Sequence, residues 1–154
     1  MSRPSGTRGA ALRVHVKLET GTTRQGIGPD EAVDFVKALR KIKGVEVEGI
    51  SSHFADSEDP RSKYALEQLA RYNNAVERLN MAKIAIPVHH TACTAATLLY
   101  PPTYGNLVRV GIGMYGLWPS VDVQSSQQAR TTKLQPVLTW KTIVAQVKNV
   151  KKGT

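Results

Sequence analysis

An alternation of strand-like and helix-like segments constrains the fold of this chain more than any other feature. Four runs have the alternating or continuous apolar pattern of β-strands, at residues 12–20, 45–54, 84–91 and 106–112. Apolar residues at helical spacing lie between them, at residues 29–44, 59–79 and 94–100. A repeat of about 30 residues is the length of one strand, one helix and their return. The pattern therefore predicts an α/β fold with a parallel sheet.

Four such units are about half of a (β/α)8 barrel, which takes about 250 residues. The pattern changes after Pro119, because residues 120–135 are polar and residues 137–150 have a β-like pattern with no helix after it. We expect a flexible or truncated start at residues 1–11 and a partial barrel over residues 12–119. A linker and the first strand or strands of a C-terminal β-domain should follow over residues 120–154. A small open α/β sheet, complete as it stands, is the alternative.

Charge and composition narrow the classes of partner. The net charge of +9, from 21 basic and 12 acidic residues, permits nucleic-acid binding, but no stacking aromatic residues are interleaved with the basic ones. We therefore expect no nucleic-acid partner. A basic nucleic-acid-binding domain stays open as the least favoured alternative. The single cysteine, Cys93, rules out an internal disulfide, and no apolar run reaches the roughly 18–20 residues of a membrane span. We expect a cytoplasmic protein with no membrane partner.

The run at residues 106–116 carries one arginine and then three glycines, Gly111, Gly113 and Gly116. A buried guanidinium without a partner costs several kcal/mol, so we expect Arg109 to meet a specific partner. Glycines after a strand allow the backbone to approach a ligand closely, often a phosphate. An arginine at the edge of a sheet, followed by an ordinary turn, is an equally good interpretation of this run alone.

Polar residues gather at the predicted carboxyl ends of the strands, where α/β barrels place their active sites. They are Lys17, Glu19 and Arg24, then His53 and Asp56, then His90 and Thr94, and finally Arg109 and Gly111. Together they predict a cationic pocket for an anionic, phosphorylated ligand. No carboxylate pair suits glycoside hydrolysis and no metal-ligand spacing is present, so we expect no metal.

Each pocket residue also has a simpler interpretation. Lys17 fits the solvent face of a strand, His53 fits a hydrogen-bonded core histidine, and Thr94 fits a helix N-cap. His89 and His90 are neighbours on a strand and point to opposite faces, so at most one of them faces the pocket.

Four motifs resemble those of bacterial alanine racemases in order and spacing. They are VHVKLETGTTRQG at 14–26, SHFADSE at 52–58, HTACTAA at 90–96 and RVGIGMYG at 109–116. The resemblance implies the second half of a (β/α)8 barrel that binds pyridoxal 5'-phosphate, followed by the start of a C-terminal β-domain. It also implies a homodimer that interconverts L- and D-alanine and supplies D-alanine for peptidoglycan.

The resemblance assigns roles residue by residue. Arg109 matches the arginine that donates a hydrogen bond to the pyridine nitrogen of the cofactor, and His53 matches a histidine that braces this arginine. Arg24 matches an arginine near the phenolic oxygen and the substrate, and Lys17 matches a lysine whose carbamate holds that arginine. The resemblance also assigns the binding of the cofactor phosphate to the Thr94 hydroxyl and to the backbone N–H groups of Gly111 and Ile112.

The chain departs from the family pattern in two ways. The family's Asp-Thr-Gly-Met-Gly-Arg is here the stretch from Glu19 to Arg24, with Thr23 in place of the second glycine, and Cys93-Thr94 replaces Asn-Ser. The family's Schiff-base lysine and catalytic tyrosine motifs match nothing in the chain. We therefore expect a racemase segment that is inactive alone. The alternatives are a non-catalytic protein that binds pyridoxal phosphate on the same barrel, and a racemase for serine or another small amino acid.

Overall fold

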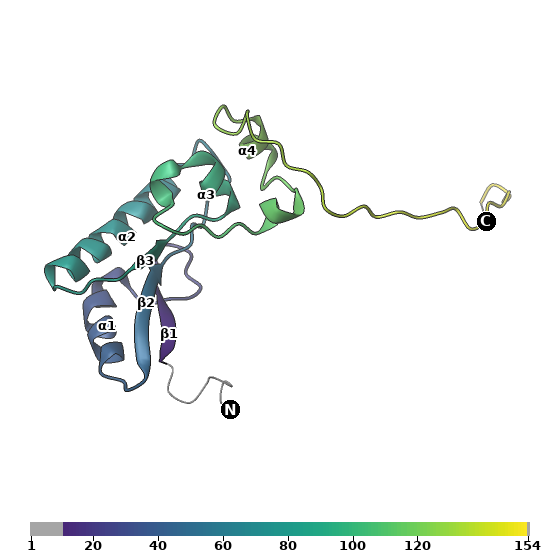
Figure 1. Cartoon of the computed structure of the whole chain (residues 1–154). Helices are drawn as coiled ribbons and strands as arrows, with labels where there is room; N and C mark the ends of the chain where they lie inside the picture. The colour runs from purple at the N-terminus through teal and green to yellow at the C-terminus, as the bar shows by residue number, and fades with distance from the viewer. Residues whose placement is uncertain (1–10, 154) are drawn as a thin grey trace.

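The computed structural model describes residues 11–153. The start predicted at residues 1–11 lies outside this range, except for residue 11. Three parallel strands alternate with helices that cross over between them (Figure 1). The elements in chain order are β1 (Leu12–Lys17), η1 (Pro29–Glu31), α1 (Ala32–Arg40), β2 (Val45–Ser51), α2 (Tyr64–Met81), β3 (Val88–His90), α3 (Thr94–Leu99), η2 (Pro101–Thr103), η3 (Ile112–Tyr115) and α4 (Val121–Ser125).

The sheet has the order β1-β2-β3, and each pair of neighbours is parallel. The first pair contains a shift of register, because Val14 pairs with Val47 whereas His15 pairs with Gly49. Glu48 is therefore an additional residue on β2, and side chains beyond it change faces. Parallel strands end at one edge, so the loops after all three strands lie together (Figure 1).

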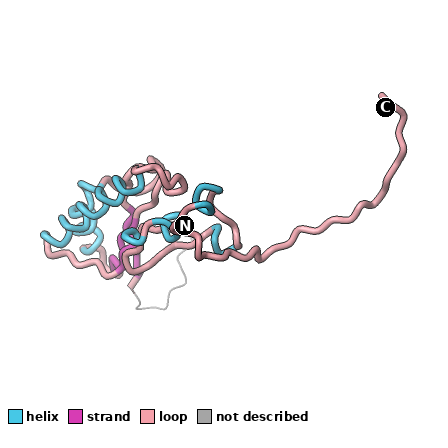
Figure 2. The backbone as a smooth tube through the Cα atoms, turned by 90° about the horizontal axis from the view of Figure 1, so that it is seen from above, coloured by secondary structure: helices cyan, strands magenta, loops and turns pink. Residues whose placement is uncertain are grey.

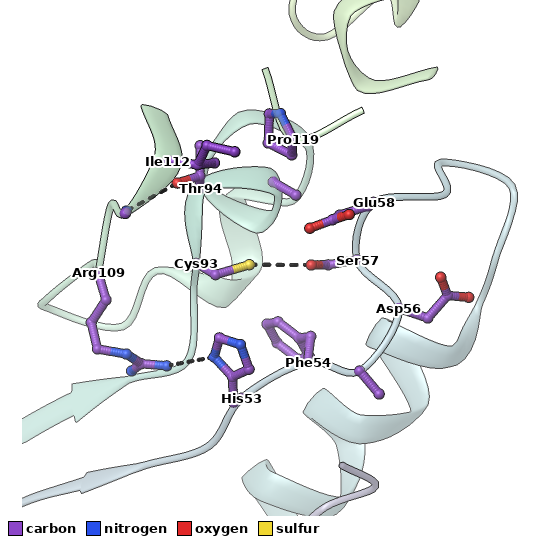
Figure 3. Close-up of a pocket in the computed structure, with 13 residues that line it drawn as sticks. His53, Phe54, Asp56, Ser57, Glu58, Cys93, Thr94, Arg109, Ile112 and Pro119 are labelled. Atoms are coloured by element: carbon purple, nitrogen blue, oxygen red, sulfur yellow. Dashed lines mark hydrogen bonds between the residues drawn. The ribbon is translucent and has the colours of Figure 1, made fainter. Parts of the chain in front are cut away.

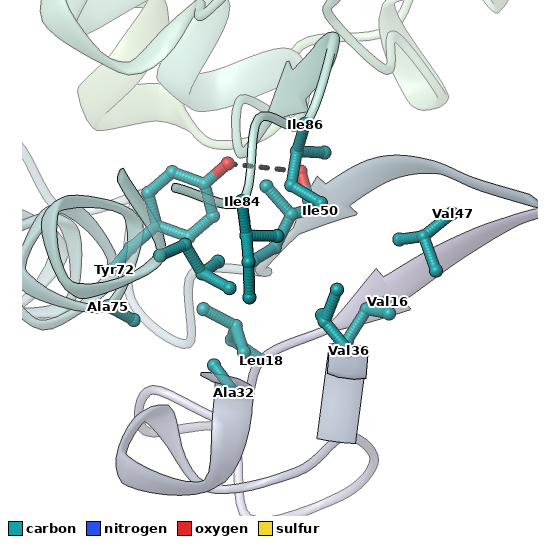
Figure 4. Close-up of a cluster of buried hydrophobic side chains, with 11 residues drawn as sticks. Val16, Leu18, Ala32, Val36, Val47, Ile50, Tyr72, Ala75, Ile84 and Ile86 are labelled. Atoms are coloured by element: carbon teal, nitrogen blue, oxygen red, sulfur yellow. Dashed lines mark hydrogen bonds between the residues drawn. The ribbon is translucent and has the colours of Figure 1, made fainter. Parts of the chain in front are cut away.

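The main core lies between the sheet and the helices α1 and α2, which cover the same face (Figure 2). Val16, Ile50 and Val36 are almost fully buried there (Figure 4). The Tyr72 hydroxyl of α2 donates to the Ile50 carbonyl at 3.0 Å, which ties the helix to the central strand. Burying one such aliphatic side chain stabilises the fold by about 1.5–3 kcal/mol.

The predicted strand at residues 106–112 does not form. Its backbone lies beside the end of β3, where the Asn106 N–H donates to the His89 carbonyl at 3.1 Å and the Arg109 N–H donates to the Ala92 carbonyl at 2.9 Å. These bonds are three residues apart on both segments, whereas a parallel ladder repeats every two residues. Gly105, in the left-handed region at φ +60°, begins this irregular path.

The β-structure predicted within residues 120–154 is also absent from the described part of that segment. Residues 121–125 form α4. Residues 137–150 extend away from the sheet and helices and pair with no strand of the described residues (Figures 1 and 2). Trp140 is 91% exposed and Ile143 is 88% exposed. A single extended segment gains no ladder hydrogen bonds, so an apolar alternating sequence is not enough to make a strand. Its assignment to a second domain stays a prediction.

The described residues supply three of the strands of a parallel α/β sheet, fewer than the four predicted. No helix within residues 11–153 has the length and apolarity needed to cross a membrane.

Candidate functional site

A cavity of about 300 Å³ opens at the carboxyl ends of β2 and β3 (Figure 3). The loop after β2 forms one wall, the start of α3 forms another, and the segment from Arg109 to Ile112 closes the third. Of the predicted site residues, the structure brings His53, Thr94, Arg109, Gly111 and Ile112 together around this cavity.

Arg109 is held mainly by backbone carbonyls. Its Nη2 donates to the carbonyls of Ser52 at 2.7 Å and Thr91 at 3.3 Å, and its Nη1 donates to the carbonyl of His90 at 2.9 Å. Nη1 also donates to Nδ1 of the His90 ring. Burial lowers the pKa of Arg109, yet an arginine remains charged in proteins. These contacts join the ends of two strands, so Arg109 has specific partners, although it lies in an irregular segment beside the sheet and is followed by the short helix η3.

These contacts use the four N–H bonds of the two terminal nitrogens, and His53 Nδ1 is a further acceptor at Nη2. A guanidinium has five N–H donors, so the Nε–H is the one left without an acceptor within residues 11–153. Because Arg109 lines the cavity, this donor is available to a ligand that presents a hydrogen-bond acceptor.

His53 lies beside Arg109, with its Nδ1 3.5 Å from Nη2 (Figure 3). Burial lowers the pKa of His53, and three neighbouring cations lower it further. These cations are Arg109, Lys17 and Arg24. The imidazole is thus kept neutral in a strongly positive environment, which favours an anionic ligand.

Thr94 forms the opposite end of the cavity and is buried. Its Oγ1 accepts hydrogen bonds from the backbone N–H groups of Gly111 at 3.0 Å and Gly113 at 3.3 Å. Both acceptor positions of the hydroxyl are then filled, and its O–H has no acceptor in the part of the chain that the structure describes. A Cβ on Gly113 would lie 2.7 Å from the Thr94 methyl group, so the close approach requires glycine here. The Gly111 N–H would have to leave Thr94 to reach a phosphate.

The loop that follows β1 is organised by one carboxylate. Glu19 accepts from the Gly21 N–H at 2.6 Å, the Thr22 hydroxyl at 2.7 Å and the Arg24 N–H at 3.2 Å. Burial raises the pKa of Glu19, but the hydrogen bonds from the Thr22 hydroxyl and the loop N–H groups outweigh it and lower the pKa to about 2. Arg24 itself is exposed and lines a neighbouring cavity together with His53.

A buried polar network connects this loop to the wall of the cavity. Gln68 of α2 is fully buried; its Nε2 donates to the His53 carbonyl at 3.1 Å and to Thr20 Oγ1 at 3.2 Å, and its Oε1 accepts from the Ala55 N–H at 2.8 Å. Thr20 Oγ1 also lies 2.6 Å from the Ser52 hydroxyl. The network fixes the backbone that presents the Ser52 carbonyl to Arg109.

The two adjacent histidines point to opposite faces, as the strand alternation predicts. The His89 ring contacts the Tyr72 hydroxyl of α2 at 3.2 Å, whereas the His90 ring reaches Arg109. The motifs assign the brace of Arg109 to His53, but His90 makes the closer ring contact. Its position at the carboxyl end of the third strand is the sequence signal that points to it.

Comparison with known proteins gives one consistent family. The family model described as the alanine racemase N-terminal domain matches residues 3–119. The alanine racemase of Halothermothrix orenii is 37% identical over 142 residues, which are 92% of this chain and 36% of that protein.

Solved structures agree with the sequence comparison. The alanine racemase of Clostridium difficile 630 in complex with cycloserine matches with a TM-score of 0.76 and 32% identity, over 83% of this chain and 34% of that one. The alanine racemase of Bacillus anthracis with bound L-Ala-P matches with a TM-score of 0.73 and 31% identity, over 82% of this chain and 32% of that one. The chain spans about a third of the length of these proteins.

Proposed function

Because the chain belongs to the alanine racemase family, we propose that it is the part of a pyridoxal-phosphate-dependent racemase that holds the cofactor's ring and phosphate. In this proposal residues 12–119 belong to the second half of a (β/α)8 barrel, and residues 120–154 lead into a C-terminal β-domain. Family membership supports this placement.

The observation that carries the proposal is a pair of unused donors at two ends of one cavity. The Arg109 Nε–H and the Thr94 O–H both lack acceptors among the described residues, and both residues line the cavity. Pyridoxal phosphate presents a ring nitrogen and a phosphate, which are acceptors of the kind that these donors need. The positive charge around His53 suits the anionic phosphate. The residues present therefore fit this cofactor.

Each side chain then has a definite task. Bound pyridoxal phosphate supplies an electron sink for the negative charge that develops at the substrate α-carbon. Arg109 cannot give up its proton, so it donates a hydrogen bond and leaves the ring nitrogen unprotonated, which weakens the sink and disfavours transamination. Thr94 holds the phosphate through its O–H, with Ile112 N–H beside it.

The substrate is a small amino acid, which we take to be alanine. Two similar proteins were solved with small ligands, cycloserine and L-Ala-P, and both are named alanine racemases. We assign Arg24 to the substrate side of the site, with Lys17 holding it in place. Racemisation needs one base on each face of the α-carbon. We place both bases outside residues 1–154, so these residues alone should be inactive.

The same family resemblance supports the wider setting that we propose. The full-length protein is a cytoplasmic homodimer, and its product D-alanine is used in the cell wall.

Exchange of the α-proton tests the proposed reaction. The full-length protein that contains this segment should exchange the α-proton of L-alanine and of D-alanine into heavy water, measured by proton NMR. L-Serine in the same assay tests the nearest alternative substrate. Binding of the cofactor without exchange of any of these protons would instead support the non-catalytic protein.

Arg109→Lys tests the assignment of the ring contact. A flexible ammonium replaces a planar donor that four acceptors hold in place, so the absorbance of the bound cofactor should shift and alanine turnover should fall by at least about tenfold. Lys148→Arg, in the exposed segment beyond residue 137, is the matched control and should leave both unchanged. An Arg109→Lys protein with the spectrum and turnover of the wild type contradicts the assignment.

A further inference from the structure

A row of hydrogen-bonded side chains crosses the sheet on the face opposite α1 and α2. His15 Nδ1 lies 2.7 Å from His90 Nε2, and the two ring centroids are 4.9 Å apart. His15 Nε2 lies 3.2 Å from Glu48 Oε2, and His90 Nδ1 contacts Arg109. The row therefore runs from Glu48 through two imidazoles to the guanidinium at the cavity.

The two imidazoles belong to strands that are not neighbours. His15 is on β1 and His90 is on β3, with β2 between them. They meet because Gly49 of β2 has no side chain: a Cβ there would lie 2.5 Å from His15 Nδ1. The register shift at Glu48 places Gly49 opposite His15. The contact between the two rings thus depends on two features of β2: the glycine leaves the space, and the additional residue sets the register.

The direction of every hydrogen bond in the row follows from Arg109. A guanidinium only donates, so His90 Nδ1 must accept and the single proton of a neutral His90 must be on Nε2. That proton is donated to His15 Nδ1, which leaves the proton of a neutral His15 on Nε2, facing the Glu48 carboxylate. All three links are satisfied at once by two neutral imidazoles and one charged carboxylate.

We propose that His15 and Glu48 are positioning residues of the cofactor site, which hold His90 in the one tautomer that can accept a hydrogen bond from Arg109. Loss of His15 leaves the buried Nε2–H of His90 without an acceptor, and His90 can then turn or change tautomer. Arg109 keeps its carbonyl contacts but loses the ring contact that orients its Nε–H. The role of Arg109 toward the cofactor rests on the proposed function, whereas the tautomers do not.

The environment of His90 agrees with a neutral ring. Burial lowers its pKa to about 4, and the charge of Arg109 and the neighbouring rings of His15 and His89 contribute in the same direction. His90 is only 7% exposed. It is therefore neutral at neutral pH, as the row of hydrogen bonds requires.

The tautomers can be measured directly. Solid-state NMR of the full-length protein with 15N-labelled histidine, with resonances assigned by the variants H15N and H90Q, should show both His15 and His90 protonated on Nε2 alone. A Nδ1–H tautomer or an imidazolium for either ring at neutral pH overturns the proposal. This result does not depend on whether the protein is a racemase.

Two variants break the row at different residues. In H15L the acceptor for His90 is removed, and in G49A the new methyl group displaces the His15 ring. Both should lower kcat for alanine by about tenfold with KM changed by less than twofold, and both should shift the absorbance of the bound cofactor. Replacing His15 by asparagine, whose Oδ1 can accept near the position of Nδ1, should restore most of kcat.

Glu48→Gln should give a smaller loss than H15L, because an amide can still accept from His15 through its oxygen. Glu46→Gln is the control, since Glu46 is exposed on the same strand and makes no side-chain hydrogen bond within residues 11–153. Wild-type spectra and turnover in both H15L and G49A overturn the positioning role. A wild-type protein that binds the cofactor and exchanges no α-proton contradicts the proposed function alone, because the tautomers still decide the role of His15.

Discussion

At the scale of single residues, Thr23 has the least favourable backbone of the loop that carries Arg24. Its φ is +49°, in the left-handed region that β-branched residues rarely adopt, and it stands where the family pattern has its second glycine. The hydrogen bonds to Glu19 hold the loop in this shape. The loop therefore keeps the shape that a glycine would adopt freely, and a threonine is strained in it.

Thr23→Gly should relieve this strain. The left-handed conformation costs an L-residue about 1–2 kcal/mol, whereas a glycine costs about 0.5–1 kcal/mol in unfolded-chain entropy. We expect the free energy of unfolding of the full-length protein to rise by about 0.5–1 kcal/mol in urea denaturation. Thr23→Ala keeps the left-handed penalty and should change it by less. A Thr23→Gly protein that is less stable than Thr23→Ala contradicts the strain.

Single residues also show where sequence reasoning succeeds. His53 and Thr94 could be placed in one pocket because each follows a strand, and parallel strands end at the same edge. Arg109 reaches the same pocket from the run expected to be the next strand, although that run is irregular in the structure. The contact between His15 and His90 could not be predicted, because it depends on a register shift that no local pattern announces. The unused Nε–H of Arg109 could not be predicted either. It is left over because three carbonyls on two separate segments accept from the terminal nitrogens of the guanidinium.

At the scale of elements, α2 does more than cover the sheet. Gln68, fully buried on this helix, hydrogen-bonds the loop that carries His53 and also the loop that follows β1. The helix thus sets the backbone positions on which the Arg109 contacts depend.

Gln68→Leu should remove this support. The variant leaves a buried N–H and carbonyl unpaired, which costs about 1–3 kcal/mol. We expect a lower melting temperature for the full-length protein and weaker binding of pyridoxal phosphate, measured by fluorescence titration. Asn74→Leu, an exposed amide on the same helix, is the control. Equal melting temperatures for the two variants would show that the network does not stabilise the fold.

Elements were predictable where periodicity and burial agree. Helices α1 and α3 and the strands β1, β2 and β3 lie within the predicted segments, and α2 extends two residues beyond the predicted 59–79, to Met81. The three helices and the strands β1 and β2 each bury apolar residues in a core cluster. The run at 106–112 has the composition of a strand, but strand formation also needs a partner in register. Its two backbone bonds to the end of β3 do not provide that register.

At the scale of the whole molecule, the large apolar side chains after Pro136 are exposed to solvent. Val137, Trp140, Ile143 and Val147 are each at least 67% exposed. A segment with this sequence gains stability only by pairing with other strands and burying one face.

Hydrogen exchange tests whether this segment joins a sheet. We expect the amides of residues 137–150 to be strongly protected in the full-length protein and to exchange without protection in a protein of residues 1–154, measured by mass spectrometry. Residues 45–51 of β2 provide an internal reference for protection in both. Unprotected amides at 137–150 in the full-length protein would contradict a strand there.

The hydrogen bonds from Arg109 to backbone carbonyls have a consequence for how the sequence around this site can vary within the family. Every residue type carries a carbonyl, so a substitution at position 52 or 91 removes no acceptor by itself and acts on Arg109 only through the path of the main chain. The site can therefore tolerate genetic drift around the guanidinium as long as the path of the main chain is kept. Selection should fall on Arg109 itself and on the small residues that shape that path.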